Sequence, residues 1–155
     1  MTMLSLLGRL LAALLLAGTL AACTTLGGTG LVASTVTTEL TPEASTAISG
    51  DMVGRLAEQV GPGSTTITLT PDGSVFGQAL EASLKGWGYA IVTDQQTNGT
   101  ATVPLAYVVD AFEGSVLVRL STSTVDITRM YKLSATGAEP TSPVSVMQRG
   151  QGGTS

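Results

Sequence analysis

The chain has 155 residues, of which 11 are acidic, 7 are basic and none is histidine, so its formal net charge is −4 at pH 7. It has no basic stripe that could neutralise phosphates, which argues against direct binding of nucleic acid. The lack of histidine excludes imidazole-based metal sites and Ser-His or Cys-His nucleophile pairs, and no Gly-x-Ser-x-Gly elbow occurs.

The N-terminus has the features of a signal peptide. Arg9 is followed by an apolar run over residues 10–20, which is shorter than the roughly 20 residues needed to span a bilayer. Ala21 and Ala22 are small, as a signal peptidase requires, and Cys23 follows them as the only cysteine of the chain. We therefore predict a signal peptide over residues 1–22, with cleavage between Ala22 and Cys23.

Leu20-Ala21-Ala22-Cys23 resembles the lipobox of bacterial lipoproteins. The resemblance implies acylation of Cys23, with palmitate among the lipids, and Thr24 in place of an inner-membrane Asp implies the outer membrane. The alternatives are an uncleaved helix, or an ordinary secretory signal beside an incidental cysteine. Residues 23–35 are rich in Gly and hydroxyl side chains without apolar periodicity, which predicts a flexible tether.

A first helix is predicted from Thr41 onward. Thr41 suits the N-cap, Pro42 the first helical position and Glu43 the positive end of the helix dipole. A stripe of apolar residues repeats every four positions: Ile48, Met52, Leu56 and Val60. Gly61-Pro62-Gly63 ends the helix. Gly50 and Gly54 either permit close approach to a sheet or partner or are tolerated surface glycines.

A strand and a second helix follow. Residues 65–70 alternate apolar side chains with threonine, which predicts a strand closed by the turn Pro71-Asp72-Gly73. Ser74 suits the N-cap of a helix that ends near Gly86 and Gly88. We expect Trp87, the only tryptophan, to pack between this helix and the sheet.

Four more strands are predicted at residues 88–93, 102–110, 115–121 and 125–133, the last three as an antiparallel meander. Residues 36–40 are a candidate for a further strand. Pro104 indicates an edge strand or a strand start. The expected fold is therefore α/β (α+β), with two amphipathic helices on one face of a mostly antiparallel sheet of about five strands. The domain spans residues 36–134, and residues 135–155 form a disordered tail.

No catalytic constellation is evident. Asp94, Asp110 and Glu113 each read as solvated turn residues, and nothing in the sequence brings two carboxylates into one cleft. We therefore predict neither an enzyme nor a site for a metal or cofactor.

Several long stretches of the chain resemble the conjugal transfer protein TrbH family. These stretches are residues 37–44 (TTELTPEA), the run from Asp51 to Gly63, residues 76–81 (FGQALE) with 86–89 (GWGY), and residues 103–110 (VPLAYVVD). The resemblance implies a lipoprotein of the mating-pair-formation apparatus, a type IV secretion system. It also implies a structural role beside VirB9-like and VirB10-like components of the core complex, and a domain similar to the N0 domain of secretins.

Two hypotheses follow. In the first, the chain is an outer-membrane-anchored structural subunit with its domain in the periplasm, and a sheet edge such as Thr102 to Asp110 binds neighbours by strand addition. In the second, it is a periplasmic ligand-binding or regulatory lipoprotein with a cleft between the helices and the sheet.

Overall fold

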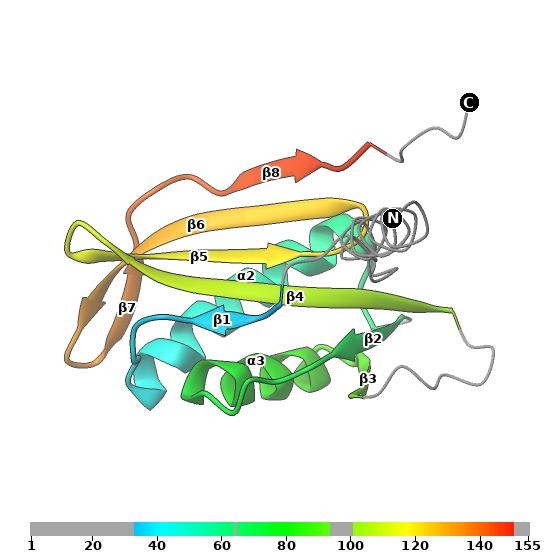
Figure 1. Cartoon of the computed structure of the whole chain (residues 1–155), viewed down its shortest axis with the longest axis horizontal. Helices are drawn as coiled ribbons and strands as arrows, with labels where there is room; N and C mark the ends of the chain where they lie inside the picture. Colours follow the sequence, from blue (N-terminus) through cyan, green and yellow to red (C-terminus); the bar gives the residue numbers. More distant parts are fainter. Residues whose placement is uncertain (1–32, 64, 94–100, 151–155) are drawn as a thin grey trace, which may run out of the picture.

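In the part of the chain that the structure describes, two helices and one eight-stranded sheet make up the domain (Figure 1). A computed structural model describes residues 33–63, 65–93 and 101–150. The elements in chain order are β1 (Thr35–Val36), α2 (Pro42–Val60), β2 (Thr66–Leu69), α3 (Val75–Gly86), β3 (Ala90–Val92), β4 (Thr102–Phe112), β5 (Ser115–Ser121), β6 (Val125–Ser134), β7 (Gly137–Pro140) and β8 (Ser145–Gln148). The predicted α+β class and the antiparallel meander of β4, β5 and β6 are confirmed.

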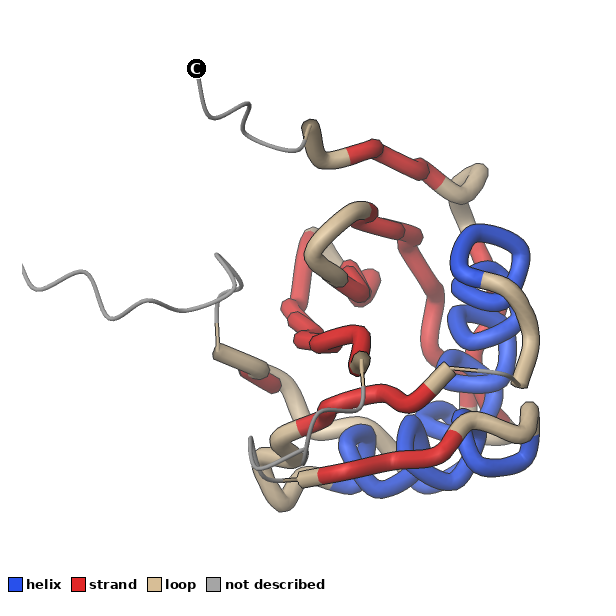
Figure 2. The backbone as a smooth tube through the Cα atoms, turned by 90° about the vertical axis from the view of Figure 1, so that its right-hand side faces the viewer, coloured by secondary structure: helices blue, strands red, loops and turns tan. Residues whose placement is uncertain are grey.

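The sheet is mixed and open, with the order β3-β2-β4-β5-β6-β7. One edge of β4 pairs in parallel with β2 and then with β1, whereas its other edge pairs with β5. One edge of β6 likewise pairs with β8 and then with β7. Figure 2 shows the strands curling, with both helices on one face.

The two helices begin at the predicted caps. The Thr41 hydroxyl accepts a hydrogen bond from the Ala44 amide at 3.2 Å, and Pro42 occupies the first turn. The Ser74 hydroxyl accepts one from the Gly77 amide at 3.0 Å. Each cap satisfies an amide that the helix itself leaves unpaired. Neither described helix is long and apolar enough to cross a membrane.

The core lies between the helices and the inner face of the sheet. Its largest fully buried side chains are Tyr107, Tyr131, Phe76, Ile48, Met52, Leu56, Ile67, Leu69, Leu80, Leu84, Leu120 and Ile127. The predicted stripe of α2 therefore faces inward, except for Val60 at the end of the helix, which is only partly buried. The sheet supplies the other side of the core, because side chains alternate along a strand and every second residue of β4, β5 and β6 points to the helices.

The structure differs from the sequence-based expectation after residue 134. The segment predicted to be a disordered tail contains β7 and β8, which extend the sheet to eight strands rather than about five. β7 forms a tight hairpin with β6, and Gly137, the first residue of β7 after the turn, has a φ of 153°. Arg149 then ties the end of β8 to Asp126 through two hydrogen bonds of 2.8 and 2.9 Å. Pairing with β6, rather than an apolar period of their own, orders these residues.

Two further expectations were wrong. Residues 102–110 do not form a free edge, because β4 lies inside the sheet. Trp87 does not pack between helix and sheet, since 46% of it is exposed. The expectation for Pro104 as a strand start is confirmed, because it lies near the beginning of β4, before pairing with β5 starts at Ala106.

Candidate interaction surface

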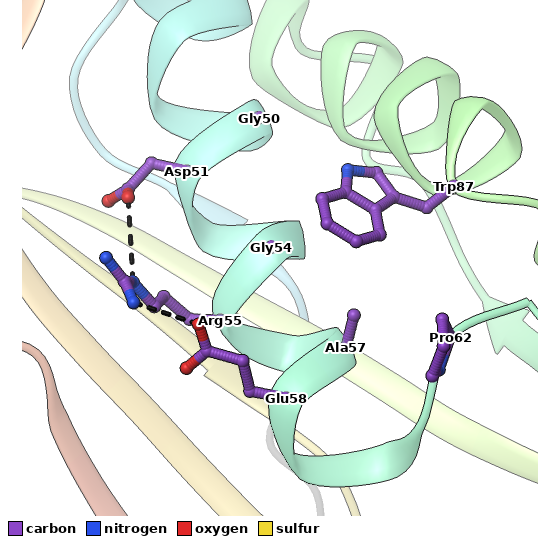
Figure 3. A pocket seen from close by; sticks show the side chains of 8 residues that line it. All are labelled: Gly50, Asp51, Gly54, Arg55, Ala57, Glu58, Pro62 and Trp87. Atoms are coloured by element: carbon purple, nitrogen blue, oxygen red, sulfur yellow. Dashed lines mark hydrogen bonds and ion pairs between the residues drawn. The ribbon is translucent and has the colours of Figure 1, made fainter.

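A groove with a volume of about 480 Å³ runs along the outer side of α2, next to the end of α3. Its lining residues are Gly50, Asp51, Gly54, Arg55, Ala57, Glu58, Pro62 and Trp87. In Figure 3 the Trp87 indole faces α2 across the groove at the level of Gly54. We call this feature the Trp87 groove.

Two glycines of α2, Gly50 and Gly54, leave room for the Trp87 ring beside the helix. A Cβ atom added at Gly54 would lie 3.5 Å from Cζ2 of Trp87, whereas one at Gly50 would meet nothing within 4 Å. Gly54 therefore faces the tryptophan rather than the sheet. Gly50 leaves open space beside it.

Local backbone structure holds Trp87 at the surface. It caps α3, and its amide donates to the carbonyls of Ser83 (3.1 Å) and Leu84 (3.2 Å). Gly88 then turns the chain with a φ of 91°. No acceptor for the indole N–H is found among the described residues, so the ring combines a half-exposed apolar face with a free donor. This combination is typical of tryptophans at protein interfaces.

Charged side chains form one rim of the groove. Arg55 contacts Glu58 at 2.9 Å and Asp51 at 3.8 Å. These pairs are exposed, so they contribute little to stability. The rim thus holds two acidic side chains and one basic side chain, and the other residues that line the groove are uncharged.

Asp51 also fastens α2 to the sheet. Its carboxylate accepts hydrogen bonds from Nη1 of Arg129 at 2.8 and 3.0 Å and from the hydroxyl of Tyr131 at 2.6 Å. Burial raises the pKa of Tyr131, and the neighbouring Asp51 carboxylate raises it further. Tyr131 therefore stays neutral and acts as a donor, which fixes the helix that carries most of the groove.

A second cavity of about 510 Å³ lies between residues 36–40 and residues 72–76. The Asp72 carboxylate there accepts from the hydroxyl of Tyr107 at 2.6 Å, and from the hydroxyl and the amide of Ser74 at 2.5 and 3.0 Å. Burial raises the pKa of Asp72, but these hydrogen bonds outweigh it, so the pKa lies below its ordinary value. Asp72, one of the two charged residues that line this cavity with Glu39, is thus already used to shape the loop before α3.

The residues selected from the sequence do not converge. Asp110 accepts a hydrogen bond from the hydroxyl of Thr37, and Glu113 lies exposed in the β4–β5 turn with a φ of 47°. Ala22, Cys23 and Asp94 lie outside the described residues. Within the described ranges, no three or more Asp, Glu, Cys or His side chains are grouped so as to hold a metal.

Sequence reasoning missed the Trp87 groove. The available signal was a pair of glycines, four residues apart on a helix, in a chain with a single tryptophan just beyond a second helix. That signal was incomplete, because only the packing of α2 against α3 brings Gly54 and Trp87 together. The role of Asp51 had no sequence signal, since its partners lie 78 and 80 positions away.

Comparison with known proteins gives one consistent result. A family model described as "Conjugal transfer protein TrbH" matches residues 26–150. The chain is 48% identical over 125 residues to the "Probable conjugal transfer protein TrbH" of Sinorhizobium fredii (strain NBRC 101917 / NGR234), which covers 77% of this chain and 84% of that relative. No solved structure matches the chain, so the likeness to the N0 domain of secretins stays a prediction.

Proposed function

The chain belongs to the TrbH family of conjugal transfer proteins, and from this premise we propose that it is an outer-membrane lipoprotein and a structural subunit of the conjugative type IV secretion complex. Cys23 carries the lipid, and the α+β domain stands in the periplasm. Two or more acyl chains anchor a protein durably, because one chain alone holds only marginally.

The observation that carries the structural role is the half-exposed Trp87 in its groove. The only tryptophan of the chain sits on Gly54, beside a rim with charges of both signs, and no described residue accepts a hydrogen bond from its indole N–H. Such a side chain gains contact area at a low entropic cost when a partner covers it. We propose that the Trp87 groove receives another component of the apparatus, such as the VirB9-like or VirB10-like protein of the core complex.

The second cavity supports the alternative of a ligand-binding lipoprotein less well. Of its two charged lining residues, Glu39 and Asp72, the Asp72 carboxylate is already paired with Ser74 and Tyr107. A ligand that used this group would have to break the hydrogen bonds that begin α3. We therefore favour a structural subunit that binds another protein over a lipoprotein that binds a ligand.

The anchor is tested by replacing Cys23 with serine in the full-length protein. We expect palmitate labelling to disappear and the protein to leave the membrane fraction, because the acyl chains have lost their attachment atom. Unchanged labelling and fractionation of Cys23→Ser would refute the anchor.

The role of the groove is tested by Trp87→Ala, with Val75→Ala as the matched control. Both side chains belong to α3 or its cap, and they are similarly exposed, at 46% and 44%. Truncating an interface anchor costs about 2 kcal/mol or more of binding, roughly a 30-fold loss of affinity. We expect Trp87→Ala to lower plasmid transfer while circular dichroism and membrane level are unchanged, and Val75→Ala to transfer normally. Equal transfer by both variants would remove the groove from the mechanism.

A further inference from the structure

Strand β8 is an outer strand of the sheet with no partner on its far side among the described residues. All four of its residues are exposed, in contrast to those of β6 beside it. Met147, at 61%, is the most exposed large apolar side chain in the described part of the chain, and Val146 is 40% exposed. Figure 1 shows this strand along the rim of the sheet.

This edge lacks the features that usually prevent strands from pairing between molecules. Ser145–Gln148 contains no charge and no proline, although edge strands are commonly protected by lysine, by proline or by extreme shortness. The other outer strands do have such protection. β1 and β3 have only two and three residues, and β7 contains Glu139 and Pro140. β8 is therefore the edge best suited to accept a further strand.

The register of β8 fixes which main-chain groups point outward. The amide of Arg149 donates to the carbonyl of Thr124 at 2.7 Å. Because hydrogen-bonded pairs alternate along an antiparallel ladder, Met147 and Ser145 also direct their main-chain groups to β6. The amide and carbonyl groups of Val146 and Gln148 therefore point away from the sheet.

We propose that two copies of this chain pair through β8, antiparallel and across a two-fold axis, with Met147 opposite Met147 of the second copy. In this register Val146 of each copy exchanges both main-chain hydrogen bonds with Gln148 of the other. In the pair, the two Met147 side chains, which are highly exposed in a single copy, lie on the same face of the joined sheet and cover each other. A single strand that is complementary to itself meets the requirement of an isologous contact.

The short length of β8 sets the condition under which the pair forms. Four residues per copy bury far less than the roughly 800 Å² per partner of a stable interface. Copies that are held in one membrane plane, however, meet at a high effective concentration. Pairing of β8 would add to the proposed structural role. It depends on the proposed lipid anchor only because the anchor supplies this high effective concentration.

The test is disulfide cross-linking of full-length Met147→Cys in membranes under mild oxidation. Opposed residues of a non-hydrogen-bonded antiparallel pair have Cα atoms about 4.5 Å apart, which a disulfide can bridge. We expect a covalent dimer on a non-reducing gel that reductant abolishes. Glu139→Cys on β7, an exposed position on the neighbouring outer strand, is the matched control and should stay monomeric.

A second variant separates pairing from chance collision. Val146→Pro removes an amide that faces away from β6, which an edge strand tolerates, but it deletes two of the four hydrogen bonds between the copies. Adding it to Met147→Cys should lower the dimer yield severalfold at an unchanged membrane level.

The outcomes are distinct. No dimer with Met147→Cys, a yield equal to that of Glu139→Cys, or a cross-link to a different protein in place of the dimer each overturns the proposal. The wild type, whose only cysteine is Cys23, should give no cross-link. A wild-type dimer would show a free thiol at Cys23, and so would refute the anchor rather than the pairing.

Discussion

Replacing Gly77 with alanine should destabilise the domain, although alanine is the better helix former. Gly77 lies in the first turn of α3, and a Cβ atom there would come closer than 3.0 Å to the hydroxyl of Tyr107. It would also lie 3.0 Å from Oδ1 of Asp72. Neither neighbour can move away easily, because Tyr107 is fully buried, packs edge-on against Phe76 and donates to Asp72 at 2.6 Å.

The net effect follows from two opposing terms. Alanine gains up to about 1 kcal/mol over glycine from backbone propensity. Inserting a methyl group into a packed core costs about 1–3 kcal/mol, and here it also strains the hydrogen bonds around Asp72. We expect a net loss of about 1–2 kcal/mol in the free energy of unfolding, which lowers the melting temperature by roughly 4 °C per kcal/mol for a domain of this size.

Urea unfolding followed by circular dichroism measures this loss, with Gly50→Ala as the matched control. An added Cβ at Gly50 meets nothing within 4 Å, so that variant should be stabilised by up to about 1 kcal/mol. Tyr107→Phe removes the clashing hydroxyl, so Gly77→Ala with Tyr107→Phe should be less destabilised than the sum of the single variants, by about 1 kcal/mol or more. Stabilisation by Gly77→Ala, equal to that of Gly50→Ala, would refute the packing of α3 on Tyr107.

Two other predictions concern the polar contacts that join distant segments. Asp51→Ala should lower the free energy of unfolding by about 1–3 kcal/mol, because Arg129 and the buried Tyr131 lose their common acceptor. Only 15% of the Arg129 side chain is exposed, so water cannot easily replace that acceptor. Urea titration of the variant measures the loss, and a change below about 0.5 kcal/mol would contradict it. The hydrogen bonds from Arg149 lower the pKa of Asp126, so its stabilising effect is fully present above the unfolded carboxyl pKa of about 3.9 and is lost as pH falls through the lower folded value. Stability should accordingly fall less between about pH 5 and about pH 2 in Asp126→Asn than in the wild type, and an identical fall in both would count against this pair.

Local signals in the sequence predicted the elements whose residues specify them on their own. α2 follows from Thr41 and Pro42 at its start, from its four-residue apolar repeat and from the glycines at its end, and the structure has the same bounds. β4, β5 and β6 follow from alternation, which survives because one face of the sheet is buried. These signals act over a few residues, so no knowledge of the neighbours was needed.

The rest depends on contacts between distant segments. β7 and β8 are short and have no clear apolar alternation of their own, and they form strands through pairing with the distant residues of β6. The interior place of β4 follows from its parallel pairing with β2, 36 positions away, and sheet order cannot be read from alternation. Trp87 continues the apolar character of α3, but it falls one residue past the last helical position, so its side chain leaves the buried face.

The small size of β1 matters for how the domain carries mechanical tension. Any pull on a membrane tether enters the fold at Thr35, yet β1 comprises only two residues and its pairing with β4 continues in one main-chain bond of 2.9 Å from Thr37 to Val109. β1 contributes no fully buried side chain, and Val36 is only partly buried. Under the proposed anchor, β1 therefore detaches first and lengthens the tether by about 3.3 Å per freed residue. If the anchor is as proposed, the detachment of β1 would take up the first pull on the tether and leave the helices and the rest of the sheet intact.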